Sequence, residues 1–69
     1  MDNQLSFFAY LLESYAARRH TDAGAVLKLL DEKKLTDFVY GMYEMYHTES
    51  LENAFRDLDS LIATGKPAW

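Results

Sequence analysis

The sequence predicts an all-α protein, a compact bundle of four short helices. Apolar residues recur three and four positions apart through most of the chain, which is the period of an amphipathic helix. No segment alternates like a strand, and no Asn-Gly or Asp-Gly pair offers a hairpin turn. Short polar hinges separate the helical stretches, as between packed antiparallel neighbours. The chain of 69 residues is one domain (1–69), with helices expected at about 3–19, 22–34, 37–47 and 51–64.

The first expected helix (3–19) carries an apolar stripe with aromatic residues on both sides of it. Phe7 and Tyr10 fall away from the centre of this stripe, so their burial requires a second neighbour, either within the fold or on a partner. The stripe itself comprises Leu5, Phe8, Leu12, Tyr15 and Arg19, with Leu11 and Ala16 beside it.

The second expected helix (22–34) begins after Thr21, whose hydroxyl is a candidate N-cap. Gly24 weakens its first turn, so we expect the start of this helix to fray. Its inward face comprises Ala23, Val26, Leu27 and Leu30.

The third expected helix (37–47) follows Thr36 as a candidate N-cap and is apolar or aromatic over most of its circumference. Such a helix belongs in the centre of a bundle. Gly41 inside it predicts the close approach of a neighbouring helix, or alternatively of a partner's backbone. We expect Phe38, Met42 and Met45 on the inward face, Val39 and Tyr46 on its shoulder, and Tyr40, Tyr43 and His47 on a second stripe.

The fourth expected helix (51–64) has the clearest boundaries. It starts after Ser50, and Gly65 offers the left-handed conformation that commonly ends a helix, while Pro67 prevents its resumption. Its apolar stripe comprises Leu51, Ala54, Phe55, Leu58, Leu61 and Ile62. The acidic residues Glu49, Glu52, Asp57 and Asp59 are interpreted as a solvated face.

Composition narrows the classes of function. Hydrophobic residues make up 49% of the chain, which excludes intrinsic disorder. The net charge of −4 disfavours binding to phosphate backbones and suits a protein that covers a basic surface on another protein. A helix-turn-helix regulator is the nearest nucleic-acid class, but its recognition helix, 37–47, contains no lysine or arginine. The absence of cysteine, of a long apolar run and of a signal-like start predicts a soluble, cytoplasmic protein without membrane contact.

We find no pattern typical of catalysis, a cofactor or a metal, so we expect a protein that is not an enzyme. His47 and Glu49 are close in sequence, but zinc needs three or four suitably spaced ligands. No serine elbow or glycine-rich phosphate loop is present, and a domain this small would hardly enclose a water-excluding pocket.

The aromatic content, 14% of the chain, exceeds what four short helices can hide. The first hypothesis is therefore a module that binds another protein; the alternative is self-association, with the same rings buried in a homodimer. Trp69 either packs back on the domain, which we favour, or is held out to a partner. The candidate partner-binding residues are Phe7, Tyr10, Tyr40, Tyr43, Tyr46, His47 and Trp69.

The chain also resembles a family of short uncharacterised bacterial proteins. Tyr43, His47 and Thr48 match a Tyr-x-x-x-His-Thr motif, an aromatic helix precedes it (Phe8 to Tyr15), and an acidic-apolar helix closes the chain. Gly24 stands where such families often have a capping glutamate. Members are often encoded beside ADP-ribosyltransferase-like proteins, so the resemblance implies an accessory or antitoxin-like partner without an activity of its own.

Overall fold

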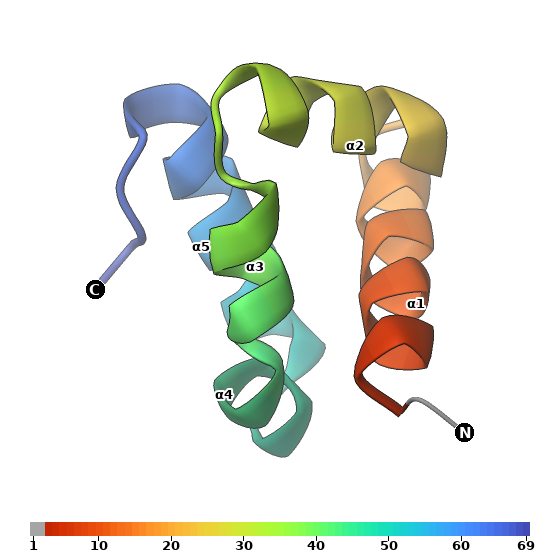
Figure 1. Cartoon of the computed structure of the whole chain (residues 1–69), viewed down its shortest axis with the longest axis vertical. Coiled ribbons are helices and arrows are strands. Elements are labelled where there is room, and N and C mark those ends of the chain that lie inside the picture. Colours follow the sequence, from red (N-terminus) through yellow and green to blue (C-terminus); the bar gives the residue numbers. More distant parts are fainter. Residues whose placement is uncertain (1–2) are drawn as a thin grey trace.

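The computed structural model describes residues 3–69, and the part of the chain that it covers is helical without any strand. The predicted all-α class is therefore confirmed. The helices are α1 (Asn3–Arg18), α2 (Ala23–Glu32), α3 (Thr36–Gly41), α4 (Tyr43–Thr48) and α5 (Leu51–Thr64). In Figure 1, α2 crosses one end of the molecule and links α1 on one side to α3 on the other, the side on which α5 also lies. The chain then turns back after α5 and runs down beside it.

The expected third helix is two helices, so the bundle has five helices between residues 3 and 69 rather than four. The break lies at Met42, whose backbone (φ −82°, ψ 13°) leaves the α-helical region. Its N–H donates to the Val39 carbonyl three residues back, at 3.1 Å, which closes α3 with a tight turn. Two short helices therefore replace one central helix, and their side chains are arranged around two separate helix axes.

Gly41 ends α3, and the close approach of a neighbouring helix predicted there is wrong. A Cβ atom built on Gly41 meets nothing within 4 Å, so the position is open. Glycine is a poor helix former, and here it stands at a helix end rather than at a helix crossing.

Two predicted helix caps are also wrong. The N-cap of α2 is Asp22, not Thr21: its carboxylate accepts the Ala25 N–H at 2.8 Å. Thr36 lies inside α3, and its hydroxyl donates to Asp31 at the end of α2. The predicted stop at Gly65 is confirmed, because this residue has a left-handed backbone (φ 80°) and its N–H donates to the Leu61 carbonyl at 2.8 Å.

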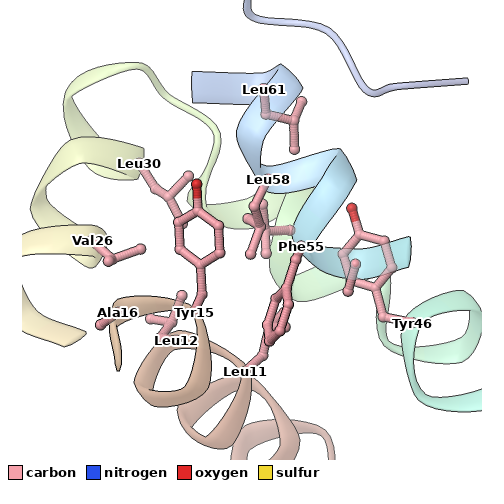
Figure 2. Packing of buried hydrophobic residues seen from close by; sticks show 12 residues of the cluster. Leu11, Leu12, Tyr15, Ala16, Val26, Leu30, Tyr46, Phe55, Leu58 and Leu61 are labelled. Carbon is pink, nitrogen blue, oxygen red and sulfur yellow. The ribbon is translucent and has the colours of Figure 1, made fainter. Parts of the chain in front are cut away.

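The core lies where all five helices meet, and Figure 2 shows its packing around Tyr15, Leu58 and Phe55. In the α3–α4 segment, the buried residues are Val39 and Tyr46, whereas Phe38 and Met45, expected inward, are each 39% exposed. The break at Met42 explains this error, since one continuous helical stripe cannot describe both helices. The buried apolar residues are Leu11, Leu12, Tyr15, Ala16, Val26, Leu30, Val39, Tyr46, Ala54, Phe55, Leu58 and Leu61.

Candidate functional site

A buried carboxylate on α5 holds the segment that follows this helix. Asp57 is only 5% exposed. Its Oδ2 accepts the indole Nε1–H of Trp69 at 2.9 Å, and its Oδ1 accepts the backbone N–H of Ala68 at 3.3 Å. The turn between α5 and this segment is closed by the Ser60 hydroxyl, which donates to the Lys66 carbonyl at 2.7 Å. Asp57 therefore determines where Trp69 lies.

The indole of Trp69 is fixed at one edge but open to solvent elsewhere. Its hydrogen bond to Asp57 fixes Nε1, yet the residue is 70% exposed. Trp69 thus combines features of both expected alternatives: its indole nitrogen is bonded to the domain, and most of the residue is exposed to solvent. Buried indole N–H groups usually find a partner, but an exposed ring held in this way is ordered before anything binds it.

Beside this ring lies a groove of about 400 Å³ between the end of α4, α5 and the returning segment. We call it the Trp69 groove. Met45 contributes a partly exposed thioether, a flexible side chain that adapts to irregular partners. Its lining residues are Met45, Glu49, Asn53, Arg56, Asp57, Ala68 and Trp69.

The charged side chains of the Trp69 groove differ in how many hydrogen-bond or ion-pair partners they have. Asp57 accepts two N–H groups from the returning segment, as described above. Exposed Glu49 accepts one long hydrogen bond, 3.3 Å from Asn53 Nδ2. The exposed side chain of Arg56 forms no ion pair or hydrogen bond with any residue of the described range 3–69. The groove therefore exposes two charged groups to solvent: the guanidinium of Arg56, which has no partner, and the carboxylate of Glu49, which has one long hydrogen bond.

Behind the groove, Tyr46 is 2% exposed and belongs to the core. Its hydroxyl is buried without a well-formed hydrogen bond among the described atoms. Burial of the ring, followed by the nearby Asp57 carboxylate, raises the pKa of Tyr46 above its usual value of 10.0. Tyr46 was predicted as a contact residue, and in the described fold its ring is covered by the core.

Three other predicted contact residues use their rings within the fold. Phe7 packs edge-on against Tyr43, with ring centroids 5.7 Å apart, and Phe8 does the same to Tyr40 at 5.3 Å. These contacts join α1 to α3 and α4, and they leave Phe7, Tyr40 and Tyr43 half-buried. Several of the aromatic side chains that were predicted to exceed the needs of the core therefore pack between helices of the same chain.

His47 and Tyr10 remain exposed but lie outside the Trp69 groove. The imidazole of His47 stacks on Tyr43 with centroids 4.2 Å apart, and its Nδ1 lies 2.7 Å from the Tyr43 carbonyl oxygen. Tyr10 is 55% exposed on α1. Of the seven predicted contact residues, Trp69 alone lines the groove.

Sequence reasoning missed the role of Asp57. The carboxylate was assigned to a solvated face, although it lies three residues after Ala54 and four before Leu61, on the buried stripe. That position was the available signal, because a carboxylate at helical core spacing needs a hydrogen-bond donor nearby. Met45 and Arg56 were missed as well, since their exposure side by side depends on how α4 and α5 pack.

A second polar cluster joins α1 to α5. The Tyr15 hydroxyl donates to Asp59 Oδ1 at 2.5 Å, and Arg19 Nη1 pairs with the same oxygen at 2.9 Å. Burial, then the hydrogen bond and charge of Asp59, raise the pKa of Tyr15 to about 12. Arg18 pairs with Glu52 at 2.7 Å. All these charges are paired between helices, so the cluster serves to join them.

Nothing in the described residues 3–69 assembles a metal site of three or more His, Asp or Glu side chains. In the same residues, no helix has the length and apolar character needed to cross a membrane.

The fold and the surface define a class: a small all-α domain whose returning C-terminal segment presents an ordered, exposed tryptophan. The chain belongs to the family described as protein of unknown function DUF3791, whose model matches residues 6–64. The family match agrees with the expected resemblance to short uncharacterised proteins. No curated protein and no solved structure matches the chain.

Proposed function

We propose that this protein is a small, non-enzymatic module that works by binding a polypeptide at the Trp69 groove. The observation that carries the proposal is the state of Trp69: its indole nitrogen is held by Asp57, 2.9 Å away, while the residue is 70% exposed. A ring that covers little core and yet is fixed in position suits an intermolecular contact better than a folding role.

The composition of the groove supports this proposal. Trp, Arg and Met are enriched in protein interfaces, and Trp and Arg dominate the residues whose loss weakens binding most. Trp69, Arg56 and Met45 bring all three types to one hollow. Because Asp57 already fixes the returning segment, binding costs less conformational entropy than it would with a free end.

The finer proposal is an accessory or antitoxin-like role in the bacterial cytoplasm, beside a protein encoded by a neighbouring gene. Support comes from the resemblance of Tyr43, His47 and Thr48 to the family motif and from the net charge of −4, which suits a basic partner.

The test is co-expression of the tagged chain with the product of the adjacent gene, followed by purification of the complex. Trp69→Ala is expected to weaken binding at least about tenfold, the typical effect of losing a tryptophan anchor. Tyr10→Ala removes an equally aromatic, exposed ring outside the groove and is the matched control. Equal binding by both variants, or no complex with the wild type, would contradict the proposal.

A further inference from the structure

We propose that the returning segment (65–69) is a latch that opens while the domain stays folded, and that in the open state the Tyr46 hydroxyl replaces this segment as the donor to Asp57. This inference rests on the proposed binding role of the Trp69 groove and adds how the groove is controlled. Ala68 and Trp69 both line the groove, so the groove is complete only while the latch is closed.

Hydrogen bonds, rather than buried apolar surface, hold the returning segment in place. Within 65–69 only Pro67 is half-buried, and the other four residues are exposed. Two N–H groups of the segment donate to Asp57, at 2.9 and 3.3 Å, and the Ser60 hydroxyl closes the preceding turn. Segments with few buried apolar contacts open at a much lower free energy than the core does. The returning segment is therefore the part of α5 and its surroundings that detaches first.

Opening of the latch takes both of these donors away from a buried carboxylate. Asp57 is only 5% exposed, and a buried carboxylate without a hydrogen-bond donor is strongly unfavourable. Without a substitute donor, the latch would stay closed until the whole domain unfolds. The fold supplies a substitute on α4.

That substitute is Tyr46, whose hydroxyl is buried without a well-formed hydrogen bond among the described atoms. In Figure 2 its ring lies beside α5. Burial, and then the charge of Asp57, raise the pKa of Tyr46, which places the hydroxyl close to this carboxylate. A phenol donates to a carboxylate through a charge-assisted hydrogen bond, roughly twice as strong as one between neutral groups. Asp57 therefore has a donor within reach in both states.

The two states are balanced because each satisfies a group that the other leaves unpaired. The closed state pairs Trp69 and Ala68 with Asp57 but leaves the Tyr46 hydroxyl buried without a partner. The open state pairs Tyr46 with Asp57, and water hydrates the two freed N–H groups. A partner that covers the indole of Trp69 binds the closed state alone, so its binding shifts the population toward that state.

The test is the rate at which the indole N–H of Trp69 exchanges with solvent, measured by NMR on the wild-type chain alone. Trp69 is the one tryptophan, so its indole gives a single signal. Exchange should be slower than in free tryptophan but much faster than at the backbone N–H of Leu58, in the buried part of α5.

The decisive variant is Tyr46→Phe, which removes only the hydroxyl. It should slow exchange of the indole N–H at least about tenfold, because the open state loses a charge-assisted hydrogen bond while the closed state loses an unpaired buried hydroxyl. A tyrosine that merely packs in the core gives no reason for a tighter latch.

Two further variants serve as controls. Tyr10→Phe removes the hydroxyl of an exposed ring outside the groove and should leave the exchange rate unchanged. Ser60→Ala removes a hydrogen bond that closes the turn before the latch, so it should speed the exchange. Circular dichroism checks that each variant keeps its helices.

An indole N–H in Tyr46→Phe that exchanges at the wild-type rate or faster overturns the inference. A wild-type indole as protected as the Leu58 amide, or as unprotected as free tryptophan, overturns it equally. These measurements need no partner, so their failure is distinct from failure of the proposed function. A groove that never opens can still capture the adjacent gene product, whereas a working latch on a chain that captures nothing loses only the binding role.

Discussion

At the scale of single residues, Asp57 has more consequences than any other polar side chain described here. It is buried, it holds Trp69 and Ala68, and its charge lies near the hydroxyl of Tyr46. A carboxylate in an apolar stripe is unfavourable unless donors reach it. The returning segment supplies those donors, so the core and the exposed tryptophan depend on one side chain.

Replacing Asp57 by alanine should therefore free the tryptophan. Loss of the two hydrogen bonds should cost about 1 kcal/mol of unfolding free energy, since the freed N–H groups become hydrated. Acrylamide should quench the fluorescence of Trp69, the one tryptophan in the chain, more strongly than in the wild type. Glu13→Ala removes an exposed carboxylate from α1 and is the control. Unchanged quenching in Asp57→Ala would show that other contacts hold the indole.

The buried phenol of Tyr15 makes the free energy of unfolding depend on pH in the alkaline range. Its folded pKa, raised to about 12, exceeds the ordinary value of 10.0. The phenol is neutral in both states below pH 10.0, so its contribution is fully present there and is lost as pH rises toward about 12. Tyr46 shifts in the same direction.

Urea unfolding at a series of pH values checks this expectation. The wild type should lose stability as pH rises above 10.0, and the loss should be smaller in Tyr15→Phe because one shifted phenol is gone. Tyr10→Phe, at an exposed position, should keep the full pH dependence of the wild type. A Tyr15→Phe profile as steep as that of the wild type would contradict the assignment.

At the scale of elements, the ends of the helices differ in chemistry. α5 ends with a glycine in the left-handed region, whereas His20 (φ 58°) and Lys34 (φ 60°) adopt this conformation after α1 and α2. The residues after them donate N–H groups back to Ala16 and Leu30, at 2.9 and 2.8 Å. The left-handed conformation is sterically unfavourable for residues with a side chain, so glycine is the usual signal for it. The ends of α1 and α2 lack that glycine and could not be recognised from the sequence in this way.

Alanine substitutions at Gly41 and Gly65 should change the stability of the fold in opposite directions. At Gly41 a Cβ meets nothing within 4 Å and the backbone is helical, so Gly41→Ala should stabilise the fold by about 0.5–1 kcal/mol. At Gly65 the φ of 80° opposes a side chain, so Gly65→Ala should destabilise it by about 1 kcal/mol or more. Thermal unfolding followed by circular dichroism measures both. A loss of stability in Gly41→Ala would indicate that the break at Met42 needs the glycine.

At the scale of the whole molecule, a dozen apolar side chains from five helices form a single core. A core in a chain of this length rarely supplies more than ~3–5 kcal/mol of stability. One central residue can therefore decide whether the protein is folded.

Substitution of Leu58 tests whether the total stability of the fold is as small as this. Leu58 is completely buried on α5, and truncating such a leucine costs about 2–5 kcal/mol. Leu58→Ala should leave much of the protein unfolded at room temperature, read as lost ellipticity and a lower urea midpoint. Tyr10→Ala, at a position 55% exposed, should change stability by less than about 0.5 kcal/mol. A cooperative, near-wild-type transition in Leu58→Ala would mean that stability comes from elsewhere, for which dimer formation is the first explanation to examine.

Local chemistry alone was sufficient to predict the helical class, the stripe of α5 and its stop at Gly65, because helical periodicity and left-handed glycine act within a few residues. The break at Met42, the burial of Tyr46 and the return of Trp69 to Asp57 were not predictable in this way. Each depends on which surfaces meet after the helices have packed, and twelve residues separate the indole from its carboxylate. Packing of α4 against α5 converted a tryptophan near the end of the chain and an acid in an apolar stripe into one exposed, ordered groove.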